Sequence, residues 1–348
     1  LVGESHTWGL FPSVSGEWDV KHEAFLRGVD AVNRLKFRIG YGESGNLAGI
    51  SAYNAVRRMV PTNVVPVNGA PVVTMSEARN YNPDLRWETR GTFNVGAEAA
   101  LWDNRLILTV AYYHAVTRDM LYEYEVPVPP FVYNKLLANN GTLSNDGWEL
   151  GLGASLLRTR DWGLDVNANL TVQRSRLRSL GGACLGMQLT APRITPIGGM
   201  ELGAGFHGGN NNVLYQIVGQ PLGVFYLPKS TGLELQPDGS RRYEIEDLDH
   251  NGRINVEDGG DRYVAGQATP KVMLGSNIAV RYKNWDLTMQ INGAFGHKIF
   301  NATALAYMNM TSFPDYNVMR GAPQQNIKDQ NVTDYWLEKG DYVNVDYI

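Results

Sequence analysis

Cysteine, excess charge and long apolar runs are all scarce in this sequence. Cys184 is the one cysteine among 348 residues, which excludes an internal disulfide framework and a cysteine-rich metal site. The formal net charge is −4, from 31 basic and 35 acidic residues, without a basic run, so we expect no nucleic-acid partner. No apolar run approaches the roughly 18 residues of a membrane-spanning helix. Because the chain begins at Leu1 without a charged and then apolar segment, we expect no secretion signal within it.

The common catalytic motifs are missing as well. The six histidines show no His-Glu-x-x-His spacing and no paired ligands. Gly151 and Gly153 precede no expected helix, so a dinucleotide-binding loop is not expected there. Cys184 lies in a glycine-rich stretch without a nearby basic residue, which favours a free surface thiol over a nucleophile. No serine stands in a nucleophile-elbow motif. We therefore expect that the protein is not an enzyme.

The sequence does contain strict alternation of apolar and polar residues. Between residues 163 and 173 the apolar positions are Leu164, Val166, Ala168, Leu170 and Val172, and the polar positions are Asp165, Asn167, Asn169, Thr171 and Gln173. A strand that is so polar on one face cannot be buried on both sides. The 38 glycines, 18 tyrosines and 10 phenylalanines also fit strands and tight turns better than helices.

This alternation predicts an all-β protein with about nine antiparallel strands. They lie near residues 13–18, 35–42, 92–101, 106–117, 148–157, 163–174, 271–282, 285–296 and 341–348. Several run for about ten residues, which is typical of a tilted membrane strand. An open sheet in lipid would leave two edges of unpaired backbone groups, so we expect the strands to be part of a larger closed barrel.

Short and long connections alternate along the chain. The short ones lie at 102–105, 158–162 and 283–284, and the long ones at about 43–91, 118–147, 177–270 and 298–340. The link 19–34 takes a short-side position but has room for a helical turn. Barrels threaded through a membrane have short periplasmic turns and long external loops, although a soluble sandwich can show the same order by chance.

Tryptophans lie at the ends of the predicted strands. Trp102, Trp162 and Trp285 fall beside short turns, and Trp87 and Trp148 fall at long-loop ends. Indole prefers the lipid headgroup zone, where its ring is in an apolar environment and its N–H is hydrated. Strand ends in any β protein also attract aromatic residues, so this pattern favours a membrane without requiring one.

Six short motifs add a family resemblance. They are residues 9–15 followed by Trp18, 35–42 followed by Gly45-Asn46, Asn82-Pro-Asp-Leu-Arg-Trp-Glu88, 112–121, 140–150 and 336–342. In this order and spacing, the motifs resemble the SusC/RagA family of TonB-linked outer membrane transporters along nearly the whole chain. The chain departs from the family at Leu227-Pro228, where an aromatic run usually continues, and in the glycine-rich stretch 198–212. Both departures bear on the ligand rather than on the fold.

The resemblance implies a large antiparallel transmembrane β-barrel of about 22 strands with long extracellular loops, in the bacterial outer membrane. Residues 1–348 would be a central part of it, and residues 177–270 a long extracellular loop region. The N-terminal plug, the TonB-binding segment, the first strands and the last strands would lie outside this sequence. The expected partners are TonB, a SusD-like surface lipoprotein, membrane lipid and an oligosaccharide or peptide substrate.

Residues 247–258 follow the Asp-x-Asp-x-Asn-Gly pattern of calcium-binding loops. The oxygen-donating positions are occupied by Asp247, Asp249, Asn251, Arg253 (through its carbonyl), Asn255 and Asp258. Gly252 permits the sharp turn that such a loop needs, but Asp258 is shorter than the usual closing glutamate. The same residues would also form an Asx-rich turn without metal, because Asp and Asn readily bond their own backbone. Ca²⁺ is the one cofactor that the sequence suggests.

Aromatic residues in the long connections are candidate ligand contacts. They are Tyr122, Tyr124, Phe131, Tyr133, Tyr215, Phe225 and Tyr226. Such rings can stack on sugars or hold peptide side chains, and they can equally pack the loops together and against the lipoprotein. The function we expect is TonB-dependent import of an oligomeric glycan or peptide. The alternative is a surface β-rich glycan-binding module without transport activity.

Overall fold

The computed structural model describes residues 2–51, 53–197 and 212–348. Strands dominate the described chain. The helical elements are short: α1 (Ala302–Tyr307), α2 (Ala322–Gln325) and the 3-10 turns η1 (Glu4–His6), η2 (Val20–His22), η3 (Met310–Ser312) and η4 (Asp334–Trp336). Among the described residues, no helix has the length and apolar character needed to cross a bilayer. The predicted helical turn in the link 19–34 corresponds to η2.

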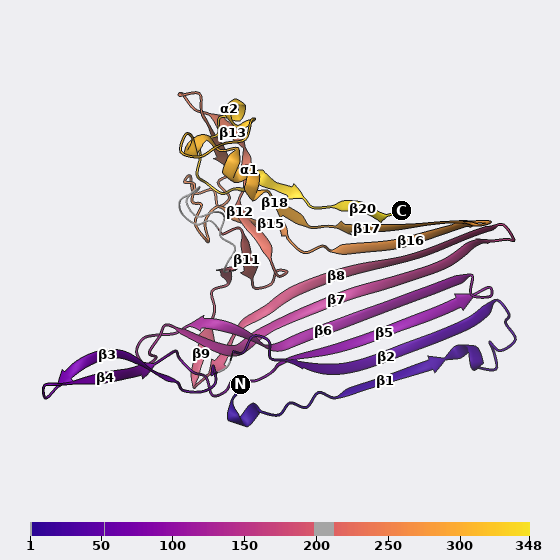
Figure 1. The fold of residues 1–348 in the computed structure, drawn as a ribbon, viewed down its shortest axis with the longest axis horizontal. Coiled ribbons are helices and arrows are strands. Elements are labelled where there is room, and N and C mark those ends of the chain that lie inside the picture. The colour runs from indigo at the N-terminus through magenta and orange to yellow at the C-terminus, as the bar shows by residue number, and fades with distance from the viewer. Residues whose placement is uncertain (1, 52, 198–211) are drawn as a thin grey trace. The chain divides into compact units, whose positions relative to one another are not determined.

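The main antiparallel sheet contains all nine predicted strands (Figure 1). They are β1 (Ser13–Asp19), β2 (Val32–Asn46), β5 (Glu88–Leu101), β6 (Leu106–Glu125), β7 (Lys135–Arg158), β8 (Trp162–Cys184), β16 (Val272–Tyr282), β17 (Trp285–Phe295) and β20 (Tyr342–Tyr347). Their hydrogen-bonded order follows the chain, and β9 (Met187–Thr190) pairs with β8 outside this path. The chain therefore runs up and down without crossovers, and the segments between β2 and β5, β8 and β16, and β17 and β20 carry the insertions.

Four smaller sheets lie in these insertions. They are the hairpin of β3 (Met59–Val67) and β4 (Ala70–Glu77), the sheet of β10 (Ile194–Pro196), β11 (Leu214–Ile217), β12 (Val224–Pro228) and β15 (Arg262–Gln267), the pair β13 (Ser230–Leu235) and β14 (Arg241–Ile245), and the pair β18 (Lys298–Phe300) and β19 (Leu337–Lys339).

The chain divides into two compact units. The first comprises residues 1–103, 109–148 and 175–193, and the second comprises 104–108, 149–174 and 194–348. Strands β1, β2 and β5 lie in the first unit, and β16, β17 and β20 lie in the second. Strands β6, β7 and β8 contribute residues to both.

In the first unit, the alternating sequence produces one apolar and one polar strand face. On the apolar face Trp18 stands opposite Phe37, and their ring centroids are 6.3 Å apart. Val14, Trp18 and Ile39 expose 72%, 52% and 54% of their surface. An apolar face left open to this extent indicates contact with another apolar phase.

The polar face of the same strands carries ion pairs between neighbouring strands. Lys36 Nζ lies 2.6 Å from Glu17 Oε1, and Arg34 Nη1 lies 2.5 Å from Glu98 Oε1. The Lys36–Glu17 pair joins β1 to β2, and the Arg34–Glu98 pair joins β2 to β5. Both ion pairs lie toward the ends of these strands that adjoin the 19–34 link and the 102–105 turn.

The second unit repeats the two-faced pattern. Val166, Ile278 and Met289 are aligned across β8, β16 and β17 on the apolar face. Trp162, Tyr282 and Trp285 are aligned in the same way beside the short turns, and the Trp162 and Tyr282 ring centroids are 4.3 Å apart. These three rings form a lateral row of the kind that lies at a membrane interface.

Strands β6, β7 and β8 extend well beyond the predicted bounds. The connection predicted at 118–147 is mostly strand, because β6 continues to Glu125 and β7 already begins at Lys135. The polar residues that suggested a loop have partners across the strands: Ser144 Oγ, for example, accepts a hydrogen bond of 2.8 Å from Arg178 Nε. The bounds of the long loop 177–270 shift likewise, since β8 continues to Cys184.

Three buried hydrophobic clusters lie in and near the long connections. The first contains Tyr124, Val126, Leu136, Ala138, Cys184 and Leu189. In the second unit, one contains Val213, Phe225, Leu227, Leu305 and Val332, and the other contains Tyr215, Ile217, Val224 and Tyr226. Water-excluding packing therefore involves the insertions and the strand ends next to them, while the apolar face of the main sheet stays open.

Candidate functional site

The aromatic residues proposed as ligand contacts in the first unit take part mainly in packing. Tyr124 is only 1% exposed and belongs to the buried cluster, with Tyr122 and Phe131 packed against it. The Tyr122 and Tyr124 rings meet edge to face with centroids 5.1 Å apart. Tyr133 keeps an exposed ring, but its hydroxyl donates a 2.7 Å hydrogen bond to the Glu77 carbonyl. Of these four residues, Tyr133 has the most exposed side chain.

The three predicted aromatic contacts of the second unit are buried. Phe225 packs in one hydrophobic cluster, and Tyr215 and Tyr226 pack in another with ring centroids 5.4 Å apart. The guanidinium carbon of Arg262 lies 5.5 Å from the Tyr215 ring centroid and 5.8 Å from that of Tyr226. The rings of Tyr215 and Tyr226 therefore pack against the guanidinium of Arg262 and are not accessible to a ligand in this conformation.

Arg262 also connects this sheet to the predicted calcium loop. Its Nη1 donates hydrogen bonds of 2.5 Å to Tyr215 Oη and 2.7 Å to Asp258 Oδ1. Its Nε donates a further bond of 2.8 Å to the Val256 carbonyl. Asp258, which sequence reasoning placed at the closing position of the loop, is thus the counter-ion of a buried arginine.

Asp261 lies beside the loop residues Asp247 and Asp249. Carboxylate oxygens of Asp247, Asp249 and Asp261 all lie within 4.8 Å of one another. Asp261 is fully buried and accepts hydrogen bonds from the backbone N–H groups of Leu248 (2.8 Å) and Asn255 (2.7 Å). The signal in the sequence is Gly259-Gly260, because a glycine pair permits the extra turn that brings Asp261 back: Gly259 has φ of +86°.

Backbone hydrogen bonds shape the rest of the loop. The amide of Gly252 donates a 2.8 Å bond to Asp247 Oδ2, which is the main reason that the pKa of Asp247 lies below its ordinary value. Asp249 accepts from the Asn251 amide (3.1 Å), and Asn251 accepts from the Arg253 amide (2.8 Å). The Asn255 side chain accepts from the Glu257 amide (3.0 Å). These bonds form Asx turns that stabilise the loop without an ion, and the converging carboxylates also fit Ca²⁺.

The motif 82–88 connects the segment that precedes β5 to strands β6 and β7 through hydrogen bonds. Buried Asn82 donates a 2.9 Å bond to the Leu137 carbonyl and a 3.4 Å bond to Cys184 Sγ. Buried Asn139 accepts from the Arg86 amide (3.0 Å) and donates to the carbonyls of Arg86 and Asp119, both at 2.8 Å. The expectation of a surface thiol at Cys184 is wrong, because the strand extension of β8 brings it into this buried region.

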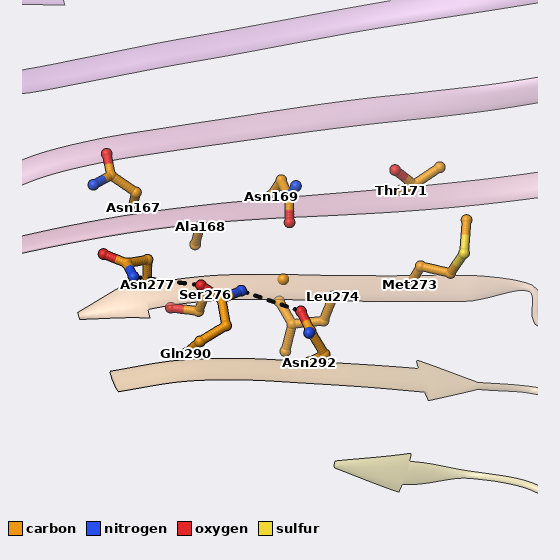
Figure 2. A pocket seen from close by; sticks show the side chains of 11 residues that line it. Asn167, Ala168, Asn169, Thr171, Met273, Leu274, Ser276, Asn277, Gln290 and Asn292 are labelled. Atoms are coloured by element: carbon orange, nitrogen blue, oxygen red, sulfur yellow. Dashed lines mark hydrogen bonds between the residues drawn. The ribbon is translucent and has the colours of Figure 1, made fainter. Parts of the chain in front are cut away.

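A polar recess lies on β8, β16 and β17 in the second unit (Figure 2). Its volume is about 470 Å³. Six polar side chains line it, Asn167, Asn169, Thr171, Asn277, Gln290 and Asn292, together with Ala168, Met273, Leu274, Gly275 and Ser276, and none of the lining residues is charged. Sequence reasoning placed the first three on a polar strand face but did not identify the recess, since cross-strand alignment is not visible in one strand.

Comparison with known proteins identifies the family. The family model described as TonB dependent receptor-like, beta-barrel matches residues 2–293. Because this match covers most of the chain, the chain belongs to this family. Its main sheet is therefore part of a transmembrane β-barrel in the bacterial outer membrane, as predicted.

Individual relatives make the assignment more specific. TonB-dependent receptor P26 of Formosa agariphila is 26% identical over 312 residues, which cover 86% of this chain and 29% of the relative. TonB-dependent receptor SusC of Bacteroides thetaiotaomicron is 25% identical over 300 residues, with 85% and 28% covered. The structure of the RagAB peptide transporter matches with a TM-score of 0.72 at 19% identity, over 99% of this chain and 37% of that chain. The chain is SusC/RagA-like and spans about a third of the length of these proteins.

Proposed function

We propose that this chain is the central barrel segment of an active importer. The whole protein would carry an oligomeric nutrient, a glycan or a peptide, across the outer membrane with energy delivered through TonB. The observation that carries this proposal is the two-faced main sheet. One face exposes apolar side chains such as Val14 and Ile39, while the other carries amides and ion pairs. A lipid-facing exterior and a hydrated interior need this division.

Uptake by whole cells tests the proposal. Cells that produce the full-length protein should accumulate labelled oligosaccharide or peptide, and deletion of either the receptor or TonB should abolish accumulation. The matched control is a strain with an unrelated TonB-dependent importer, whose uptake is lost only when TonB is deleted. Accumulation that continues without TonB would refute active import.

The alternative, a surface glycan-binding module without transport, predicts a different behaviour. Such a module would bind glycan at the cell surface without accumulation inside. It would also stay in the aqueous phase without detergent, because its apolar surfaces would be covered. The exposed apolar strand faces argue against it, since residues such as Trp285 expose 77% of their surface.

We also propose that a SusD-like lipoprotein binds at the external mouth. The hairpin β3–β4 lies in a long connection, and a two-stranded hairpin alone is marginally stable in water. Val64 pairs with Val73 and Val65 with Val72, yet these side chains expose 64%, 55%, 38% and 43% of their surface. No charged residue occurs from Val60 to Ser76. Such a surface fits an apolar protein partner.

Replacement of residues 60–76 by a short Gly-Ser linker in the full-length protein tests this contact. Co-purification of the lipoprotein should be lost, while insertion into the outer membrane is kept. Replacement of the exposed loop segment 236–239 by the same linker is the control and should leave co-purification intact. Undiminished co-purification after removal of the hairpin would contradict its role.

We further propose that Ca²⁺ binds the loop 247–261. Three carboxylates and the amide oxygen of Asn251 are the hard oxygen donors that Ca²⁺ prefers. Bound Ca²⁺ would stabilise the loop beside Arg262 and its partners Tyr215, Tyr226 and Asp258. It would so preserve the conformation of the external insertion.

A further inference from the structure

The polar recess in the second unit is built from amides aligned across three strands. Asn277 on β16 stands opposite Asn167 on β8 and opposite Gln290 on β17. Two residues earlier on β16, Gly275 stands between Asn169 of β8 and Asn292 of β17 in the same way. Two lateral rows of amides therefore follow each other along the sheet, as Figure 2 shows for the labelled side chains.

Part of this set forms an internal chain of hydrogen bonds. Asn277 Nδ2 donates to Gln290 Oε1 and Gln290 Nε2 donates to Asn292 Oδ1, both at 3.3 Å. Asn292 in turn donates to Asp346 on β20. The bonds orient these amides and use only part of their hydrogen-bonding capacity, because each amide has two N–H donors and an oxygen with two lone pairs.

Asn167 and Asn169 are free to bind a ligand. Both are exposed, and within the described part of the chain their side chains have no hydrogen-bond partner. Gly275 keeps room beside them, because a Cβ at this position would come 2.3 Å from Asn169 Oδ1. A larger residue would push the Asn169 amide out of its place.

No charged side chain lines the recess, although the Asp346 carboxylate contacts Asn292 at its edge, and further charges lie along the same strands. Asp165, Arg281 and Asp286 line a separate recess of about 540 Å³ toward the short turns. An anionic ligand would find no cation to pair with in the amide recess, and an apolar ligand would cover the amides without satisfying their donors and acceptors. Peptides bring charged termini, for which the recess has no counter-ion. A chain rich in hydroxyl groups can both donate to and accept from every amide.

We infer that this amide recess is a contact site for a neutral oligosaccharide as it passes along the barrel interior. The inference rests on the proposed import function, because only then does the polar strand face line a transport path. It goes further in naming both the substrate class and the wall residues that contact it. The site lies on the barrel wall, apart from the external loops where ligand would first bind.

Whole-cell uptake with full-length variants tests the site. The probes are a labelled neutral hexasaccharide panel, an anionic oligosaccharide panel and a peptide mixture. Wild-type cells should accumulate members of the neutral panel. In the double variant Asn167→Leu with Asn169→Leu, the uptake rate of the accepted glycan should fall about five- to tenfold, which is the expected effect of losing two neutral hydrogen bonds. Glycan binding at the cell surface should stay unchanged.

Matched controls separate this role from misfolding and from plug seating. The variant Val166→Leu changes the apolar face of the same strand outside the recess and should leave uptake unchanged. Amounts in the outer membrane and heat-dependent migration in gels report folding. Entry of a large antibiotic reports the closure of the barrel.

The outcomes are distinct. Unchanged glycan uptake in the double variant overturns the inference, and so does a rise in antibiotic entry, because the recess would then seat the plug. Accumulation of peptides or anionic glycans alone also overturns it but leaves import standing. No accumulation of any probe in wild-type cells would instead count against the proposed function itself.

Discussion

Asp258 and Asp261 are separated by three positions and face different partners. Asp258 pairs with the guanidinium of Arg262 at 2.7 Å, and Asp261 joins Asp247 and Asp249. The twelve-residue pattern ends at Asp258, whereas the carboxylate that lies near Asp247 and Asp249 is that of Asp261. The reason is physical: the Gly259-Gly260 turn brings Asp261 back to the loop, and the buried arginine pairs with Asp258.

Two substitutions separate these roles. Asp261→Asn should lower calcium affinity at least about tenfold, because it removes a charged ligand. Asp258→Asn should leave calcium affinity nearly unchanged but destabilise the protein by about 1–3 kcal/mol, since Arg262 loses a charge-assisted hydrogen bond. Isothermal calcium titration and thermal unfolding of the purified full-length protein measure both. The absence of calcium heat in the wild type would end the calcium proposal and leave the Asx turns as the account of the loop.

The pH dependence of the loop follows from Asp247. Its pKa is lowered because the Gly252 amide bonds the charged form. A carboxyl with a depressed folded-state pKa contributes stability above its unfolded pKa, about 3.9, and loses it as pH falls through the lower folded value. Calcium affinity should therefore show no loss from Asp247 protonation between pH 7 and 5. A transition centred above pH 5 that Asp247→Asn removes would contradict this assignment.

At the scale of elements, alternation predicted the main sheet well. All nine strands exist, because a period of two is a direct consequence of placing one face in lipid and the other in water. The extensions of β6, β7 and β8 into the long connections were not predicted, since residues such as Asn139 and Ser144 are typical of loops when the sequence is considered alone. The hairpin β3–β4 was missed although Asn68-Gly69 between valine-rich runs is a strong hairpin signal.

Substitutions on neighbouring residues of β8 test the orientation of the sheet. Ala168 belongs to the apolar face and Asn167 to the polar one. Ala168→Arg should destabilise the barrel by about 2–4 kcal/mol if its side chain meets the membrane interior, and Asn167→Arg should cost far less. Urea unfolding of the protein in detergent or lipid measures the difference. Equal costs for the two variants would refute the assigned orientation.

The aromatic candidates illustrate a limit of sequence reasoning about sites. Tyr124, Tyr215 and Phe225 looked suitable for ligand stacking because they fall in long connections. The structure buries them in the packing of those connections, which an isolated sequence cannot distinguish from exposure. Conversely, the recess at Asn169 and Asn277 depends on a register between strands about one hundred residues apart.

At the scale of the whole molecule, β1 and β20 end the path of the main sheet, and each pairs with one neighbour in it. In lipid, the free edges need further strands. Residues 1–348 expressed alone should therefore aggregate or remain protease-sensitive in detergent micelles, whereas the same residues within the full-length protein should be protected. Limited proteolysis with mass spectrometry compares the two. A stable, membrane-inserted fragment would show that these strands close on themselves.

The row formed by Trp162, Tyr282 and Trp285 fixes how deeply the sheet sits in the bilayer. Sliding the wall along the membrane normal would carry three indole and phenol rings out of the headgroup layer together. Asn277 lies five residues from Tyr282 and Asn292 seven from Trp285. At about 3.3 Å per residue and a tilt of about 40°, these amides stand roughly 13–18 Å above the ring row. That height is near the midplane of a hydrocarbon layer about 25–30 Å thick. In the proposed importer, a cargo would thus meet these neutral amides about halfway across the hydrocarbon layer, at the point most distant from both aqueous compartments.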